Sequence, residues 1–321
     1  MPNSASGPFW CVSLNPAIDK RMRVPRLITG NVNRVSEVRA EPGGKAAHVA
    51  MVLRALGADP VWLGFAGGSM GQQLVSGLRG IGIRTEPVMV CQNTRVNLEI
   101  IDDDGGVTEI LEPGAANEET DWKLFFRAFE KLLAEGKKGG TVIASGSLPK
   151  NADAAVYQRL TESAHSYGHK MFLDTGGEPM RMALSAKPDL IKPNRDETEG
   201  LLGKEIADRL AAKNAAQRLC EMGAQSVVVS LGSEGFVFQP GMGQEGYYVQ
   251  PVSVAARSSV GAGDATMAAF AYGLSERFEV EKTLRLAAAC GAANCLADAP
   301  ARLRMEDVGE FEGHVRIEKL A

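Results

Sequence analysis

The chain has 321 residues, of which 45% are hydrophobic and 23% charged, and its formal net charge at pH 7 is −4. These values describe an ordinary globular protein that can bury a large core without disulfide bonds or a structural metal, and they exclude a disordered or collagen-like chain. They also exclude the strong positive field that proteins use to bind nucleic acid or an anionic membrane.

The cysteines and the N-terminal residues lead us to expect a cytoplasmic protein. The first ten residues lack a basic segment followed by an unbroken apolar run, so we expect no signal peptide. The most apolar later stretches, residues 265–274 and 284–297, are rich in alanine and interrupted by glycine, asparagine or charge, so we expect no membrane span. The cysteines have neither a Cys-x-x-Cys pair nor a metal-ligand spacing and are typical of reduced thiols: Cys11, Cys91, Cys220, Cys290 and Cys295.

Short apolar segments alternate with longer helical patterns along the chain. In the first helical pattern apolar residues recur at i, i+3, i+4 and i+7 from Val49 to Leu56, and Gly57 follows as a stop signal. The alternation predicts an α/β fold with a doubly wound, mostly parallel sheet flanked by helices. The segments typical of buried parallel strands are residues 9–14, 61–66, 141–144, 170–173, 190–192 and 227–231.

Two segments interrupt this alternation. Residues 20–40 and 95–111 each have the pattern of polar strands joined by a turn, and Asp-Asp-Asp-Gly-Gly at 102–106 is a hairpin signal. We expect both segments to form one small β-sheet over the strand ends, where α/β folds bind ligands, and to act as a lid. No repeat or linker divides the chain, so residues 1–321 are predicted to form a single domain that includes this lid.

The most informative motif is Gly-Ala-Gly-Asp at residues 261–264, directly before a helical segment of small residues. Glycines at a helix start let backbone N–H groups and the positive end of the helix dipole contact an anion such as a phosphoryl group. A carboxylate would repel that anion, so we interpret Asp264 as a base that takes the proton of an attacking hydroxyl. A G-x-G-D string also arises by chance in roughly one in six such chains, so the motif is not sufficient alone.

A second motif begins where the strand at 190–192 gives way to a helix. Asn194 and Glu197 lie three residues apart, and their oxygen atoms are suited to hold the waters of a phosphate-bound Mg²⁺. The same spacing is typical of a capping box, with Asn194 as the N-cap and Glu197 in the first helical turn. The two interpretations are compatible, and both stay open.

Three further segments resemble turns that could contact a ligand. Residues 15–19 follow the first strand and residues 42–45 precede the first long helix, so Asp19 and the glycine backbone could hydrogen-bond a polyol. Residues 228–235 form a strand that ends in small residues, which suits the close approach of a nucleotide. Each of these segments is also common as an ordinary turn.

Other binding motifs find no support in the sequence. No G-x-G-x-x-G follows a predicted strand, which argues against a nicotinamide oxidoreductase, and no G-x-x-x-x-G-K-[ST] is present. His165 and His169 are spaced i, i+4, but no third metal ligand accompanies them. We interpret these two histidines as part of a solvated helix face.

Taken in chain order, these segments resemble the ribokinase-like sugar kinase family, in its phosphofructokinase B branch. The ordered set is far more specific than any one of its members. The branch that it resembles most is that of the phosphosugar kinases, which includes minor-type 6-phosphofructokinase, 1-phosphofructokinase and tagatose-6-phosphate kinase. The matching segments are residues 14–19, 42–45, 94–97, 145–149, 192–197, 230–232 and 260–264.

The resemblance implies a ribokinase-like fold and transfer of a phosphoryl group from ATP to a sugar hydroxyl. It implies that Asp264 is the general base, that the backbone of Gly261, Ala262 and Gly263 forms an anion hole, and that Asn194 organises Mg²⁺ together with Glu197. It leaves open whether a monovalent cation takes part. The residues implied to contact ATP are Lys192, Asn194, Ser230, Gly232, Gly235, Gly261, Gly263 and Asn294. Those implied to contact the sugar are Asp19, Gly43, Gly44, Lys45, His48 and Ser145.

Arg95 and Arg34 are implied to bind the phosphate already on the substrate, for which a planar guanidinium is well shaped. The expected function is ATP-dependent phosphorylation of a phosphorylated ketohexose: fructose 6-phosphate, fructose 1-phosphate or tagatose 6-phosphate. The alternatives are a kinase of an unphosphorylated sugar or nucleoside and a non-catalytic sugar-phosphate sensor. In many relatives the small sheet pairs with its copy in a second subunit, so we expect a homodimer through the lid, with no nucleic-acid or membrane partner.

The segment after the double glycine departs from the family pattern. Relatives commonly continue the double glycine as Gly-Gly-Lys-Gly-Ile-Asn-Val-Ala, whereas residues 43–50 read Gly-Gly-Lys-Ala-Ala-His-Val-Ala. His48 therefore stands where relatives have an asparagine that contacts a sugar hydroxyl. Neutral imidazole offers the same donor and acceptor, so we expect His48 to bind the sugar with a pH dependence near about pH 6.5. The alternative is that His48 packs beneath the lid.

Overall fold

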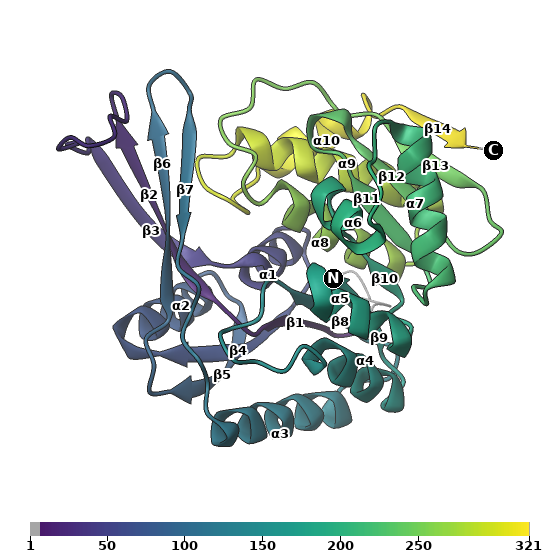
Figure 1. Cartoon of the computed structure of the whole chain (residues 1–321), viewed down its shortest axis with the longest axis horizontal. Coiled ribbons are helices and arrows are strands. Elements are labelled where there is room, and N and C mark those ends of the chain that lie inside the picture. Colours follow the sequence, from purple (N-terminus) through teal and green to yellow (C-terminus); the bar gives the residue numbers. More distant parts are fainter. Residues whose placement is uncertain (1–6, 321) are drawn as a thin grey trace.

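The computed structural model describes residues 7–320, in which a ten-stranded central sheet lies beside a separate four-stranded sheet (Figure 1). The strands of the central sheet are β1 (Phe9–Ser13), β4 (Val61–Gly67), β5 (Arg84–Val90), β8 (Thr141–Ser145), β9 (Lys170–Asp174), β10 (Leu190–Ile191), β11 (Val227–Ser230), β12 (Phe236–Gln239), β13 (Gly246–Val249) and β14 (Ile317–Leu320). Their order is β14-β13-β12-β11-β10-β9-β8-β1-β4-β5.

Helices cover both faces of the central sheet, as the predicted doubly wound α/β fold requires (Figure 1). The helices of one face are α1 (Lys45–Ala55), α2 (Gly68–Gly80), α8 (Ala262–Ser275), α9 (Val280–Leu296) and α10 (Met305–Glu312). Those of the other face are α3 (Glu119–Glu135), α4 (Val156–Ser166), α5 (Gly177–Ala183), α6 (Arg195–Leu202) and α7 (Arg209–Glu221). Two short 3₁₀ turns are η1 (Leu184–Ala186) and η2 (Gly232–Glu234).

The six predicted parallel strands are confirmed as β1, β4, β8, β9, β10 and β11. The residues between the ends of these strands are apolar because both faces of each strand are covered: in β1, Phe9 and Cys11 belong to one core cluster and Trp10 and Val12 to the other. The antiparallel strands β12 to β14 and the edge strand β5 were not expected. β5 contains Pro87 and polar residues, which an edge strand tolerates and a buried strand does not.

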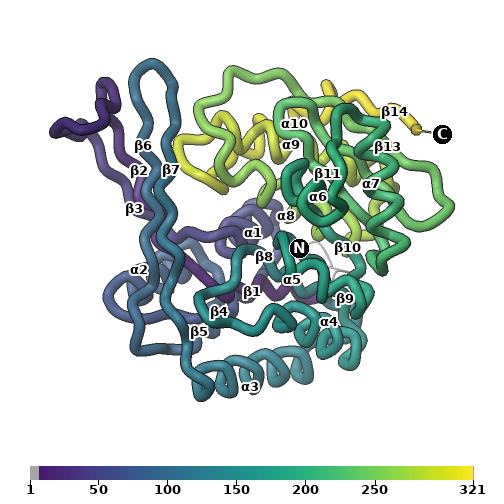
Figure 2. The backbone as a smooth tube through the Cα atoms, viewed as in Figure 1, coloured from purple at the N-terminus to yellow at the C-terminus, as the bar shows by residue number. Residues whose placement is uncertain are grey.

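The predicted accessory sheet is confirmed, and it begins three residues earlier than expected. Its strands are β2 (Ala17–Val24), β3 (Glu37–Gly43), β6 (Arg95–Asp102) and β7 (Val107–Leu111), in the order β3-β2-β6-β7. β2 pairs with β3 antiparallel and with β6 parallel. The predicted hairpin turn lies between β6 and β7, where Asp102 Oδ1 accepts the Gly106 N–H at 2.7 Å. Figure 2 shows these four strands side by side, projecting away from the helices of the main sheet. We call this sheet the lid.

The structure also bears on the predictions made for the cysteines and for His165 and His169. All five cysteines are free, as expected for reduced thiols. The prediction of a solvated helix face for His165 and His169 is wrong for His169, because α4 ends at Ser166 and the His169 ring is buried against Trp10. His165 lies on α4 and pairs with Asp189. Across residues 7–320, no helix has the length and apolarity that a bilayer crossing requires.

Candidate active site

A cavity of about 940 Å³ lies between the lid and the central sheet. Four neighbouring parallel strands lead into it at their carboxyl ends, through Ser145 at the end of β8, Asp174 at the end of β9, Lys192 directly after β10 and Ser230 at the end of β11. The opposite wall comes from lid strand β6, including Asn97 and Glu99, among others. Open α/β sheets bind ligands at this position because the strand-end loops leave a crevice there.

Asp264 lies in the first turn of α8 and lines the cavity together with Gly261 and Gly263. Gly261 has φ +83°, a left-handed conformation that favours glycine. A Cβ at Gly263 would lie 3.1 Å from Lys192 Nζ, so glycine leaves room for this ammonium group beside the start of α8. The backbone of Gly261 and Gly263 therefore lines the cavity where the anion hole is expected. Ala262 does not line the cavity, since its N–H donates to the Ser259 carbonyl at 3.1 Å.

His48 lies in the first turns of α1 and contacts two carboxylates. Its Nε2 lies 2.9 Å from Asp19 Oδ2, and its Nδ1 lies 2.8 Å from Asp264 Oδ2. Burial opposes a charge on the ring, but the hydrogen bonds and negative charges of both aspartates outweigh it and raise the pKa of His48 from 6.5 to about 10. The expected pH dependence near pH 6.5 is therefore wrong, because the ring meets two carboxylates rather than solvent.

Asp19 is held in the cavity wall by several donors. Besides His48, the side-chain amide of Asn97 donates to Asp19 Oδ1 at 2.9 Å. Burial raises the pKa of Asp19, but the hydrogen bonds from His48 and Asn97 outweigh burial, and the pKa lies below its ordinary value. Gly43 does not line the cavity, and it is needed behind Asp19 because a Cβ there would lie 2.2 Å from the Asp19 carboxyl carbon.

A buried carboxylate, Asp174, joins the two lysines of the site. Its Oδ1 lies 2.8 Å from Lys45 Nζ, and its Oδ2 lies 2.8 Å from Lys192 Nζ. Burial alone would raise the pKa of Asp174, but the two ammonium groups lower it to about 2. Burial opposes the charge on Lys45, yet Asp174 and Glu197 raise its pKa above the ordinary value. Sequence analysis missed Asp174, although a carboxylate directly after a predicted strand was a usable signal.

Asn194 and Glu197 form the capping box that the sequence left open. Asn194 Oδ1 accepts the Glu197 N–H at 2.8 Å, and Glu197 Oε2 accepts the Asn194 N–H at 2.9 Å. Both residues also line the cavity, where Glu197 Oε1 lies 3.8 Å from Lys45 Nζ. Glu197 Oε1 can thus accept hydrogen bonds from waters on Mg²⁺, which fits indirect binding. Among residues 7–320, no three His, Cys, Asp or Glu side chains converge on a direct metal centre.

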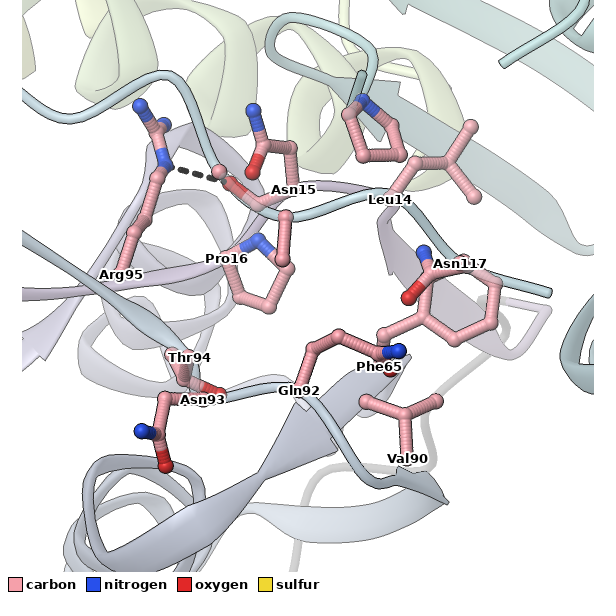
Figure 3. Close-up of a pocket in the computed structure, with 13 residues that line it drawn as sticks. Leu14, Asn15, Pro16, Phe65, Val90, Gln92, Asn93, Thr94, Arg95 and Asn117 are labelled. Carbon is pink, nitrogen blue, oxygen red and sulfur yellow. Dashed lines mark hydrogen bonds between the residues drawn. The ribbon is translucent and has the colours of Figure 1, made fainter. Parts of the chain in front are cut away.

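Arg95, at the start of β6, lines the cavity. Its Nε donates to the Asn15 carbonyl at 3.2 Å and its Nη1 to the Glu112 carbonyl at 2.6 Å. Figure 3 shows the first of these bonds at the edge of a smaller pocket that Arg95 also lines. Burial lowers the pKa of Arg95. Arg34 is exposed on the loop between β2 and β3 and does not line the cavity, because that loop lies beyond the paired ends of the two strands.

Three of the residues implied to contact ATP do not line this cavity. Gly232 and Gly235 have φ +61° and +85° and form the turn from β11 to β12, in which the Gly235 N–H donates to the Gly232 carbonyl. Asn294 is buried on α9, where its amide donates to the Val260 carbonyl at 2.8 Å and its Oδ1 accepts the Ala301 N–H at 2.7 Å. Asn294 thus supports the loop before α8.

Comparisons with known proteins agree with this geometry. The family model described as "pfkB family carbohydrate kinase" matches residues 12–302. The 1-phosphofructokinase of Xanthomonas campestris is 33% identical and aligns over 95% of this chain and 96% of its own length. The 1-phosphofructokinase of Escherichia coli K12 is 34% identical over 88% of each chain. The solved phosphofructokinase-2 of E. coli in complex with potassium superposes with a TM-score of 0.88 at 28% identity, covering 96% of this chain and 99% of its own.

Proposed function

This chain belongs to the pfkB family of ATP-dependent carbohydrate kinases, and we propose that it transfers the γ-phosphoryl group of ATP to a free hydroxyl of fructose 1-phosphate, with Asp264 as the general base. The membership supports phosphosugar kinase activity in general, and the relatives named 1-phosphofructokinase favour fructose 1-phosphate over fructose 6-phosphate and tagatose 6-phosphate. The observation that carries the proposal is the place of Asp264, beside the glycine backbone at the start of α8 and open to the cavity.

The start of α8 is suited to phosphoryl transfer. The backbone at Gly261 and Gly263, with the positive end of the helix dipole, can stabilise the negative charge of the transferred group. Asp264 in the same turn can accept the proton of the attacking hydroxyl, which then attacks the γ-phosphorus as the bond to the ADP oxygen breaks. Lys192, next to Gly263, adds a positive charge close to the same anion.

The wall near Asp19 is suited to bind the sugar. Ser145 Oγ and Asn97 Oδ1 are buried and have no hydrogen-bond partner among residues 7–320, and both residues line the cavity. Buried polar atoms without a partner cost about 1–3 kcal/mol each, so the hydroxyls of a bound sugar would satisfy them. Arg95 in the cavity lining is the guanidinium best placed for the phosphate that the sugar already has.

Mg²⁺ would accompany ATP, held by phosphate oxygens and, through water, by Glu197 Oε1 beside Asn194. When bound, it would neutralise phosphate charge during the transfer. The potassium in the solved E. coli relative supports testing a monovalent cation as well. The exposed apolar side chains of the lid, which include Val32 at 85% exposure, Ile110 at 52% and Leu111 at 58%, support pairing of the lid with a second copy of the chain.

The test is a panel of ADP-release assays with fructose 1-phosphate, fructose 6-phosphate, tagatose 6-phosphate, fructose and ribose. We expect the highest kcat/KM for fructose 1-phosphate, and the site of the new phosphate can be assigned by NMR of the product. A higher kcat/KM for either 6-phosphate would replace the proposed substrate. A preference for unphosphorylated fructose or ribose would support the alternative kinase, in which Arg95 has no phosphate to bind.

A further inference from the structure

The contacts of His48 require an explanation beyond that of a sugar contact. The side chain is 5% exposed, and each ring nitrogen lies within 2.9 Å of an aspartate oxygen. A neutral imidazole has a single N–H and could donate to only one of these two acceptors. An imidazolium has two N–H groups and satisfies both, so the geometry indicates a charged ring that bridges Asp19 and Asp264.

We propose that His48 is a positioning residue that holds the sugar-binding carboxylate of Asp19 and the base Asp264 in one rigid unit, as a charged imidazolium. This inference rests on the proposed function, because it assigns Asp264 the role of base. The ring occupies Asp264 Oδ2, and Asp264 Oδ1 has no hydrogen-bond partner among residues 7–320. The bridge thus fixes which oxygen of Asp264 is free to accept the proton of the sugar hydroxyl.

The other groups around His48 favour the charged ring. Asp19 comes from β2 and Asp264 from α8, and Lys45, one turn earlier on α1, is held by Asp174 and Glu197. The strands β1, β4 and β8, which also pack on α1, contain no charged residues. On β3, Glu41 is paired with Arg302, and Glu37 with Arg39. Two carboxylates therefore face this ring, and the neighbouring ammonium group of Lys45 is already paired with other carboxylates.

An asparagine, the residue common at this place in the resembling family, could not make the same bridge. Its amide nitrogen could donate to one carboxylate, but its carbonyl oxygen would face the other and repel it. The two aspartates would then hold less fixed positions, and Asp264 would lose its charged donor. His48 thus gives this chain a distinct way to orient the base.

The kinetic test compares wild type with His48→Asn and His48→Ala. We expect kcat to fall about 10- to 100-fold through lost orientation, while KM for ATP changes little. The KM for the sugar should rise in both variants, because Asp19 loses the same charged partner. His169→Asn is the matched control: His169 is equally buried but does not line the cavity, and its loss should leave kcat and both KM values unchanged. An unchanged kcat in both His48 variants would overturn the proposal.

A second measurement does not depend on activity. NMR of the ring nitrogens of ¹⁵N-histidine-labelled wild type, with the His48→Asn variant to assign the signal, should show both nitrogens protonated at pH 8. A neutral His48 at that pH would also overturn the proposal. If the wild type phosphorylates none of the sugars, the proposed function fails, whereas the spectrum still decides whether the charged bridge exists.

Discussion

Glu99 of lid strand β6 accepts a hydrogen bond from the Ser258 hydroxyl at 2.7 Å, and Ser258 lies in the loop that leads into α8. The second oxygen of Glu99 accepts from Arg21 Nε of β2 at 2.8 Å. One buried carboxylate therefore connects two lid strands with the loop that precedes Asp264. Because of this connection, we expect the lid and the loop that precedes α8 to move together.

Replacing Glu99 should destabilise the protein and weaken sugar binding. In Glu99→Ala the Arg21 guanidinium stays buried without its carboxylate, which typically costs about 3–5 kcal/mol. The free energy of unfolding from urea titrations and the sugar KM measure the two effects. The matched control is Glu86→Ala, which removes an exposed pair with Arg84 and should cost at most about 1 kcal/mol. Equal losses of unfolding free energy in the two variants would show that the buried Glu99 contacts contribute no more than an exposed ion pair.

Asp264→Asn should abolish most turnover and leave binding largely intact. The amide oxygen can still accept from His48, so the local structure is kept, but the amide cannot take a proton from the sugar. We expect kcat to fall by about 10²–10⁴-fold. Calorimetric titration of the variant with sugar phosphate and with ATP provides the binding control. A variant that retains more than a tenth of the wild-type kcat would remove Asp264 from the role of base.

Arg95→Ala should weaken binding of the phosphosugar by about 1.5–3 kcal/mol, because a charge-assisted hydrogen bond to the substrate phosphate is lost. The KM for ATP should not change. Arg34→Ala is the control, since Arg34 lies outside the cavity lining. If Arg95→Ala weakens phosphorylated and free sugars equally, Arg95 instead supports the Asn15 and Glu112 loops, and the substrate phosphate is bound by another group.

The stability of the protein should fall at alkaline pH because of His48. The pKa of this ring is raised from 6.5 to about 10 in the folded protein, so its protonation stabilises the fold fully below pH 6.5. That contribution decreases as the pH rises and is lost once the pH passes through about 10. We therefore expect the difference in unfolding free energy between wild type and His48→Asn to shrink steadily from pH 7 to pH 10. A constant difference over that range would mean that His48 has no raised pKa.

Local patterns in the sequence predicted the features that depend on residues close together in the chain. The buried strands followed from uninterrupted apolar runs, and the small sheet from polar strand patterns with a hairpin turn at 102–106. The same reasoning expected Asp264 and Asp19 near a ligand, and both line one cavity. The nucleotide contact at Asn294 was implied by the family resemblance alone, and in the structure its side chain hydrogen-bonds to Val260 and Ala301.

What the sequence could not predict depends on contacts between distant segments. His48 and Asp264 are 216 residues apart, and nothing in either segment indicates that one ring meets two carboxylates. Asp174 follows a predicted strand, but only the folded sheet brings Lys45 and Lys192 to it. The charges and pKa values of the site depend on these long-range contacts, so from the sequence alone we expected an unperturbed pKa for His48.

The parallel pairing of β2 with β6 has a consequence for how the protein folds. Asp19 and Asn97, which lie opposite each other in this pairing, are 78 residues apart, and α1, β4, α2 and β5 lie between the two strands in the chain. The four strands of the lid therefore cannot assemble from one contiguous segment. Closing so long a loop is entropically costly and slow, so the lid should acquire its native pairing only after the intervening α/β units have formed. The cavity would then be among the last parts of the molecule to be completed, and a peptide spanning β2 and β3 alone would not contain the lid.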